Sequence, residues 1–226
     1  VPSIEVRLIR DVSFVFGSNF LRLKNNKVIN QKLQSSKSIF SEPGDQDLLS
    51  RKKNKYRLRK YTKKIQLKTV FHVTGSFSAN WAHFLAEYFP RIEYLKMLGG
   101  EGEEIDIVIF EHTDPHIIAA IKKAVSEYSF VRLNVVPKDV EIFCSSLYYV
   151  SNNTFIGDMG SIQTPLNTLI SDSTAKYLYE FGQKTIKGLK LNSRPSRIFI
   201  GRTGKRNLSN YDEILNFFTE MGFIEV

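Results

Sequence analysis

The pattern that most constrains the fold is an alternation of strand and helix that begins at residue 105. Ile105 to Phe110 is a short apolar run that predicts a strand, and Val131 to Val136 predicts the next strand. Between them, Asp114 followed by Pro115 is typical of a helix start, and apolar residues follow at helical spacing. The segment is therefore expected to be a βαβ unit, whose strands lie parallel in one sheet with a right-handed crossover.

The chain on either side extends this alternation. Glu141 to Ser151 predicts another strand, and Thr164 to Lys187 predicts a helix. Before residue 70, short apolar runs are separated by turn-forming residues such as Gly17-Ser18, which predicts a β-rich beginning. The strands expected there are Ile4 to Ile9, Phe14 to Phe16 and Asn19 to Leu23. We therefore predict an α/β fold, a Rossmann-like parallel sheet with a β-rich N-terminal lead-in.

The end of the chain predicts a second unit of the same kind. Arg197 to Gly201 is strand-like, Asn210 and Glu213 have capping-box spacing at a helix start, and Phe223 to Val226 begins another strand. Two parallel strands cannot bury both of their faces alone, so we expect further sequence to follow. The expected division is a β-rich segment over 1–70, a Rossmann-like domain over 71–190 and the start of a second one over 191–226.

Positive charge is concentrated in one stretch. The formal net charge is +9, and residues 51–68 are rich in Lys and Arg and contain no acidic residue. A solvated strand pair or loop is one interpretation; peripheral contact with an anionic membrane surface or another polyanion is the other. No zinc, RNP-like or helix-turn-helix signal supports a nucleic-acid partner.

The compartment is expected to be the cytoplasm, at most with peripheral contact at the inner face of the membrane. Apolar runs such as Ile105 to Phe110 are far shorter than the roughly 20 residues that span a bilayer. Cys144 is the single cysteine, so no internal disulfide can form, and we expect it to be buried as a small apolar residue.

A polar stripe marks the helix expected from residue 80. At 100° per residue, Asn80, His83, Glu87 and Arg91 fall on one side of an otherwise apolar helix. A carboxylate four residues after a histidine can fix its tautomer and raise its basicity, as a general base requires. A satisfied pair inside the core is the alternative interpretation. Pro90 is expected to kink or restart the helix just after this pair.

A second polar group follows the strand expected near 197–201. Arg202, Lys205 and Arg206 lie between that strand and the helix that Asn210 begins. This is where open α/β sheets bind ligands, and cations there suit a diphosphate, although a solvated basic turn is the alternative. No histidine, cysteine and aspartate cluster completes a metal site; His112 and His116 are expected at the surface.

These two groups together resemble the sequence blocks of family 61 glycosyltransferases, which include bacterial capsular-polysaccharide enzymes. The first is Asn80-Trp-x-His83-Phe84-x-x-x-Glu87 followed by Pro90-Arg91. The second is Arg197-Ile-Phe-Ile-Gly-Arg202, then Arg206-x-Leu-x-Asn210-x-x-Glu213 and Gly222-Phe223. The resemblance covers about residues 65–226, and the family's later donor loop has no counterpart here.

The resemblance implies the N-terminal part of a two-domain GT-B enzyme that inverts configuration and needs no obligatory metal or other cofactor. Its partners would be a nucleotide-sugar donor and a glycan or lipid-linked glycan acceptor. His83 and Glu87 would be catalytic; Arg202, Lys205 and Arg206 would bind the donor phosphates; Asn80, Arg91 and Asn210 would support them. Glu87 stands where many members have aspartate. The function alternative is a non-catalytic module that binds polyanions or a membrane surface through residues 51–68.

Overall fold

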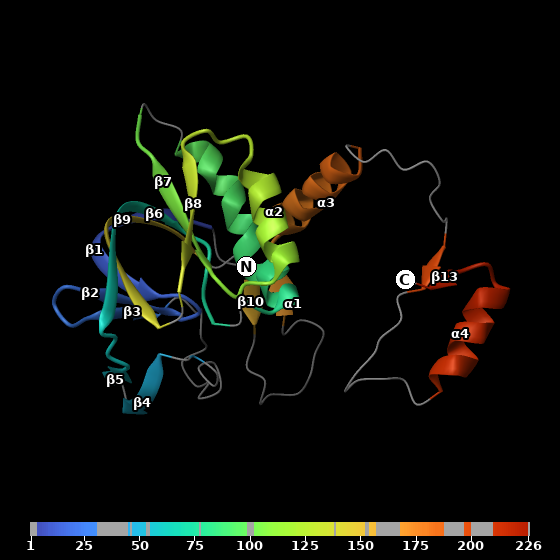
Figure 1. Ribbon diagram of the computed structural model, residues 1–226, viewed down its shortest axis with the longest axis horizontal. Coiled ribbons are helices and arrows are strands. Elements are labelled where there is room, and N and C mark those ends of the chain that lie inside the picture. Colours follow the sequence, from blue (N-terminus) through green and yellow to red (C-terminus); the bar gives the residue numbers. More distant parts are fainter. Residues whose placement is uncertain are drawn as a thin grey trace. The chain divides into compact units, whose positions relative to one another are not determined.

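The computed structural model describes residues 4–30, 45, 47–52, 55–76, 78–98, 102–137, 139–151, 154–156, 168–187, 197–199 and 210–225. The chain divides into two compact units, Val1–Gly182 and Gln183–Val226, and each is considered by itself. The first unit combines one large sheet with helices, so the predicted α/β class is confirmed there (Figure 1).

A seven-stranded sheet in the order β3-β2-β1-β9-β6-β7-β8 is the framework of the first unit. Its strands are β1 Val6–Val15, β2 Phe20–Leu23, β3 Val28–Asn30, β6 Lys63–His72, β7 Ile105–Phe110, β8 Val131–Val136 and β9 Val140–Val150. β9, β6, β7 and β8 run parallel, whereas β1, β2 and β3 form an antiparallel half joined to β9. The β-rich beginning is thus part of the same sheet, and the expected boundary at residues 70 and 71 falls inside β6.

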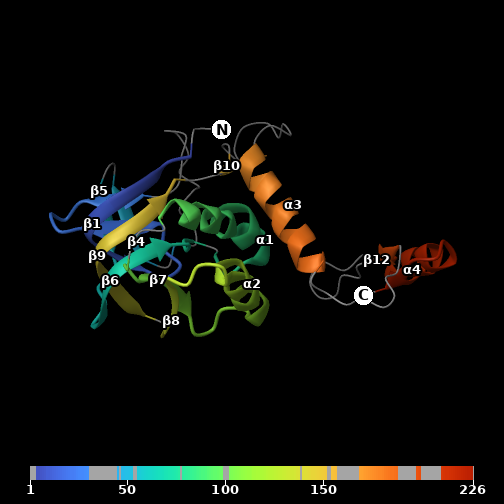
Figure 2. The same ribbon diagram turned by 90° about the horizontal axis from the view of Figure 1, so that it is seen from above.

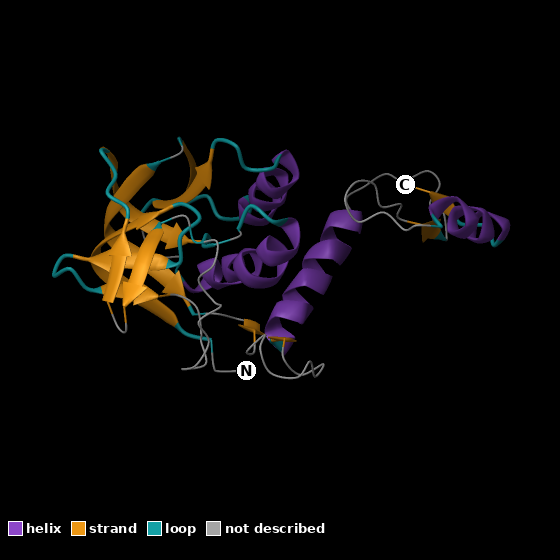
Figure 3. Ribbon diagram, turned by 90° about the horizontal axis from the view of Figure 1, so that it is seen from below, coloured by secondary structure: helices purple, strands orange, loops and turns teal. Residues whose placement is uncertain are grey.

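Helical segments follow β6 and β7, as parallel crossovers require. They are α1 Trp81–His83, a π-helical turn η2 Phe84–Tyr88, a 3-10 helix η3 Phe89–Met97 and α2 Pro115–Val125; α3 Asp172–Lys187 comes later in the chain. Asp114 caps α2 as predicted, because its side chain accepts a hydrogen bond from the His116 backbone N–H at 2.7 Å. These helices lie on one side of the sheet (Figures 2 and 3).

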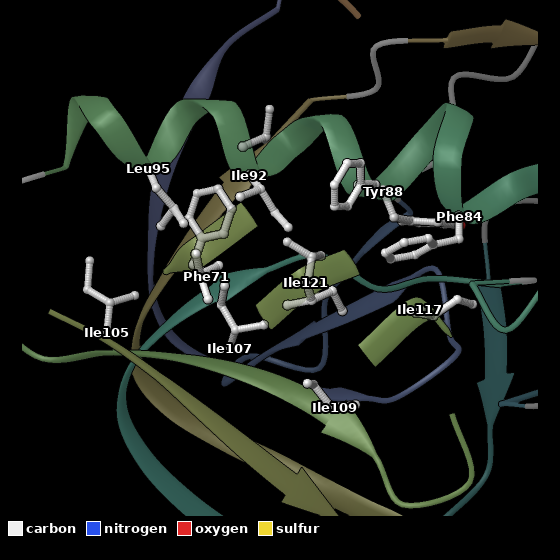
Figure 4. Close-up of a cluster of buried hydrophobic side chains, with 14 residues drawn as sticks. Phe71, Phe84, Tyr88, Ile92, Leu95, Ile105, Ile107, Ile109, Ile117 and Ile121 are labelled. Carbon is white, nitrogen blue, oxygen red and sulfur yellow. The ribbon is translucent and has the colours of Figure 1, made fainter. Parts of the chain in front are cut away.

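The main hydrophobic core lies between the helices and the sheet. Figure 4 shows Phe84, Tyr88, Ile92 and Leu95 pointing from the helical segment toward the strands. Ile105 and Ile107 meet them from β7, and Ile117 and Ile121 come from α2. These apolar residues explain why the segment from 81 to 97 remains helical although its helix type changes twice.

A second core cluster forms where the sheet curls. Val12 of β1 and Val136 of β8 belong to one buried cluster, although β9, β6 and β7 lie between their strands. β8 ends only four residues before β9 begins, a distance of at most about 14 Å along the chain. Three strand spacings alone take about 14 Å, and β9, being parallel to β8, begins at the opposite end of the sheet from where β8 stops, so a flat sheet could not accommodate this connection. The sheet therefore closes partly upon its own face.

Two features of the N-terminal half differ from expectation. The strands expected at 4–9 and 14–16 are one strand, β1, which pairs with β9 along its length; Asp11 has a φ of 51° within it. β6 was not predicted, because Lys63, Lys64 and Lys68 were interpreted only as part of the basic stretch. In β6 these lysines are exposed, while Ile65 and Leu67 are half-buried.

The helix expected over 164–187 begins later, at Asp172. Ser171 is its N-cap: the hydroxyl accepts a hydrogen bond from the Thr174 backbone N–H at 3.2 Å, and its carbonyl accepts one from Ala175 at 3.0 Å. The preceding residues form β11 Thr168–Ile170, which pairs antiparallel with β10 Thr154–Ile156. β-branched Thr168 and Ile170 favour this strand over the first helical turn that their spacing had indicated.

The basic stretch includes a strand pair. β4 Leu48–Lys52 and β5 Lys55–Leu58 form an antiparallel hairpin. Exposure alternates along β5, so that Lys55 and Arg57 face solvent while Tyr56 and Leu58 are half-buried. Tyr56 packs on Phe20 of β2 with 5.0 Å between ring centroids. This agrees with the solvated strand-pair interpretation.

The second unit contains the predicted βαβ arrangement. β12 Ile198–Phe199 and β13 Ile224–Glu225 pair in parallel, and α4 Tyr211–Glu220 lies between them in sequence. Asn210 occupies the N-cap position of α4, but its side chain makes no capping hydrogen bond. The prediction of a capping hydrogen bond from the Asn210 side chain is therefore wrong.

Gly75 supplies a stability prediction. A Cβ atom at this position would lie 2.5 Å from the Tyr88 hydroxyl and 2.7 Å from Asn19 Oδ1, both in a buried region. Gly75→Ala should therefore lower the free energy of unfolding by roughly 1–3 kcal/mol in urea titrations. Gly182→Ala in α3 is the matched control: nothing lies within 4 Å, and the helix should gain about 0.5–1 kcal/mol. Equal effects of the two changes would contradict the prediction.

Candidate functional site

The candidate site begins directly after β6, where Asn80 starts the helical segment. Its carbonyl accepts a hydrogen bond from the Phe84 N–H at 2.8 Å, and its side-chain Oδ1 lies 3.4 Å from the His83 backbone nitrogen, which donates to it. Asn80 is thus the N-cap of the helix. Its supporting role is structural: it fixes the first turn, which carries His83.

The helix changes type immediately after His83. The Phe89 N–H bonds to the Phe84 carbonyl five residues earlier, which defines a π-helical turn. Pro90 lies near the start of the 3-10 helix that follows, so the change of helix at the predicted place is confirmed. π-Helical turns of this kind occur often at functional sites.

His83 and Glu87 form the expected pair. Nδ1 of His83 lies 2.6 Å from Oε1 of Glu87. Because a carboxylate accepts, Nδ1 carries the hydrogen, and in the neutral imidazole Nε2 is then the acceptor nitrogen. The His83 side chain is 37% exposed and that of Glu87 only 9%, so the carboxylate anchors the ring from within while the imidazole faces outward. A pair sealed in the core does not have this exposure.

The aromatic residues beside the pair differ in burial. Trp81, expected among the apolar flank, is 46% exposed and stacks on buried Phe84 with ring centroids 5.9 Å apart. Phe84 in turn packs against Phe89 at 5.5 Å. The exposed indole and the half-exposed imidazole come from the first and last residues of the same short helix, two positions apart.

Arg91 lies apart from His83, in the core. It is 1% exposed; its Nε donates to the Glu87 carbonyl oxygen at 3.1 Å, and its guanidinium lies 5.0 Å from the Tyr88 ring centroid and 5.8 Å from that of Tyr149. Arg91 therefore does not continue the polar stripe that was predicted for this helix. A π-helical turn rotates later residues relative to earlier ones, and this carries Arg91 inward.

His72 at the end of β6 is a buried histidine that the sequence did not single out. Burial, with a smaller contribution from the positive charge of Arg91, holds the pKa of its imidazole well below the usual range. The ring lies edge-on to Phe14, with centroids 4.8 Å apart. His72 is therefore neutral near pH 7, as a structural residue.

A buried polar network ties this helix to the N-terminal strands. The Asp45 carboxylate accepts hydrogen bonds from the Asn19 backbone N–H at 2.7 Å and the Ser76 hydroxyl at 2.8 Å. The Tyr88 hydroxyl donates to the Ser76 carbonyl at 2.7 Å. These residues lie far apart in the sequence and carry no motif, so only the fold brings them together.

The carboxyl edge of β6 and β7 contains a small pocket. Its volume is about 10 Å³, and it is lined by apolar side chains together with Ser78 and Thr113. Such a volume holds a single water molecule. A substrate therefore cannot occupy this pocket.

The three residues expected to bind the donor phosphates lie outside the described part of the chain: Arg202, Lys205 and Arg206. Asn210, which is expected to support them, is exposed. Cys144 is buried as predicted, and burial raises the pKa of its thiol to about 12, so it remains protonated. His112 and His116 are exposed.

No group of three or more metal-ligating side chains gathers among the residues that the structure describes. In the same part of the chain, no helix combines the length and the apolar character needed to cross a bilayer. Comparisons with family models, curated proteins and solved structures found no match. The resemblance to family 61 glycosyltransferases thus rests on the two sequence blocks alone.

Proposed function

We propose that this chain is the N-terminal part of an inverting glycosyltransferase that acts in capsular or surface polysaccharide synthesis. The observation that carries the proposal is the His83–Glu87 contact of 2.6 Å, in which a buried carboxylate orients a half-exposed imidazole. The donor would be a nucleotide sugar and the acceptor a glycan or lipid-linked glycan. The chain would belong to a GT-B enzyme with a second Rossmann-like domain.

The proposed reaction is a direct displacement at the anomeric carbon of the donor. The acceptor hydroxyl attacks this carbon while Nε2 of His83 takes the hydroxyl proton, and the bond to the nucleotide diphosphate breaks. Glu87 holds the Nδ1 hydrogen and stabilises the imidazolium that forms. Arg202, Lys205 and Arg206 would bind the departing diphosphate, whose negative charge rises as the bond breaks. None of these steps requires a metal.

A binding module is the second candidate, because the described basic residues of the stretch 51–68 face solvent. Apart from Arg51 and Lys53, whose side chains are not described, they are exposed: Lys52, Lys55, Arg57, Arg59, Lys60, Lys63, Lys64 and Lys68. Such a face attracts an anionic membrane surface at the cytoplasmic side or another polyanion. It is compatible with the enzyme, which would then work as a peripheral protein at the inner face of the membrane.

Donor binding distinguishes the two functions. Calorimetry of the full-length protein with a panel of nucleotide sugars should show binding, and Arg202→Ala or Arg206→Ala should each weaken it by about 1.5–3 kcal/mol, the value of a charge-assisted hydrogen bond. Lys60→Ala, which removes a charge from the exposed basic face, is the matched control and should leave donor affinity unchanged. If all three variants have the same donor affinity, Arg202 and Arg206 do not bind the donor phosphates.

A further inference from the structure

An open pocket lies on the face of the sheet formed by β1, β2, β6 and β9. Its volume is about 320 Å³, at the lower end of the range for small-molecule sites. Polar side chains line it together with one aromatic ring: Asp11, Ser13, Arg22, Lys24, Gln66 and Phe143. Nothing in the mechanism proposed above uses these residues.

The charges at this pocket are balanced by ion pairs. Lys24 Nζ lies 2.9 Å from the Asp11 carboxylate at the rim. Arg22 is paired with Glu141 at 3.1 Å and with Asp47. A phosphate-bearing ligand needs cations that are not already neutralised, so this lining does not suit a nucleotide.

The hydrogen-bonding groups at the pocket are both donors and acceptors. Asp11 offers carboxylate oxygens, Lys24 an ammonium group, and the exposed amide of Gln66 offers both kinds of group. Phe143 adds a half-buried ring as an apolar wall, and the Lys64 ammonium lies over one face of this ring, 5.2 Å from its centroid. A ligand that matches these features has many hydroxyl groups and flat apolar faces.

The pocket lies apart from the helical layer. Val12 and Cys144, which also line it, belong to the core cluster inside the curled sheet, whereas the helix after His83 packs on the other cluster. Gln66 precedes the end of β6 by six residues, about 20 Å along the strand. A ligand here would therefore not be at the reacting carbon.

We propose that this pocket binds a short segment of glycan, about one or two sugar rings long, at a place separate from the catalytic pair. If the proposed function is correct, the pocket holds part of the growing acceptor away from its reacting end. It would then anchor a long acceptor between rounds of transfer. Binding itself depends only on the pocket and does not require that the chain be a transferase.

Saturation-transfer NMR on the whole chain, without any nucleotide sugar, tests the proposal. The probes are trisaccharides of glucose, galactose, mannose, N-acetylglucosamine or galacturonate. We expect transfer to the ring protons of at least one of them, and a Kd at least tenfold weaker for Gln66→Ala and Phe143→Leu. Gln183→Ala, the same change at an exposed site outside the pocket, should bind as the unchanged chain does.

Melting curves establish that the variants remain folded, and Gln66→Ala is the more secure of the two because Gln66 is exposed in the sheet. Absence of transfer to every trisaccharide would overturn the proposal, as would binding that both pocket variants retain. Sugar transfer assayed with a nucleotide donor is a separate measurement. Sugar transfer without trisaccharide binding would refute only the proposed glycan site. Trisaccharide binding without sugar transfer would refute only the proposed enzymatic function.

Discussion

Replacing His83 with alanine in the full-length protein is expected to reduce sugar transfer by about 10²–10⁴-fold, the usual effect of losing a general base. When Nδ1 donates to Glu87 Oε1, Nε2 is the acceptor nitrogen of a ring whose side chain is 37% exposed. Donor affinity should remain nearly the same, since the imidazole would act on the acceptor hydroxyl. Initial rates at saturating donor and acceptor measure the loss, and calorimetry measures donor affinity.

Glu87→Gln gives a closely matched test of the orienting carboxylate. The amide retains the volume of the buried side chain but cannot stabilise an imidazolium, and it favours the wrong tautomer by donating to Nδ1. We expect a loss of turnover in the same range, about 10²–10⁴-fold. His116→Ala, which removes an exposed histidine at the start of α2, is the control and should keep full activity.

Two results would contradict this role. A His83→Ala protein that fails to fold would indicate that the pair is needed for stability. A folded and fully active His83→Ala protein would exclude His83 as the base. Thermal melts recorded beside the rates separate these outcomes, and the half-exposed ring predicts that melting changes little.

The elements that were predicted from the sequence are those with strong local signals. β7 and β8 have the predicted bounds because each is a short run in which apolar residues predominate, bounded by polar turns. α2 begins as predicted because Asp114 and Pro115 together specify a helix start. The His83–Glu87 contact was predicted for a similar reason, since residues four apart on a helix are neighbours.

The features that were missed depend on tertiary structure. β6 alternates exposed lysines with half-buried Ile65 and Leu67, and the charge concealed a strand that lies in the middle of the sheet. The inward position of Arg91 follows from one π-helical turn, which an ideal helical period cannot represent. The pocket beside Phe143 is assembled from four strands and has no sequence motif.

Replacing Arg91 with alanine is expected to destabilise the first unit by roughly 3–5 kcal/mol. The side chain is among the largest that are fully buried, and its removal leaves a cavity beside Tyr88 and Tyr149 and takes away the hydrogen bond to the Glu87 carbonyl. Arg91→Met refills most of this volume and should cost considerably less. Arg7→Ala is the control: its side chain is 67% exposed and pairs with the exposed Glu5, so its loss should cost at most about 1 kcal/mol. Urea titrations give all three values.

His72 reports separately on the charge of Arg91. Burial comes first and Arg91 second in lowering the His72 pKa, so the folded state binds fewer protons than the unfolded state below about pH 6.5. The stability that this histidine contributes is present above that pH and is lost as the pH falls toward the lowered pKa.

Arg91→Met removes one of the two causes, so NMR titration of the imidazole should show a higher His72 pKa, and stability should fall less between pH 7 and pH 5. The raised pKa of Asp47 acts in the opposite direction and is shared by both proteins, so it cancels in the comparison. An unchanged His72 pKa, or a Met variant as unstable as the Ala variant, would show that Arg91 does not act in this way.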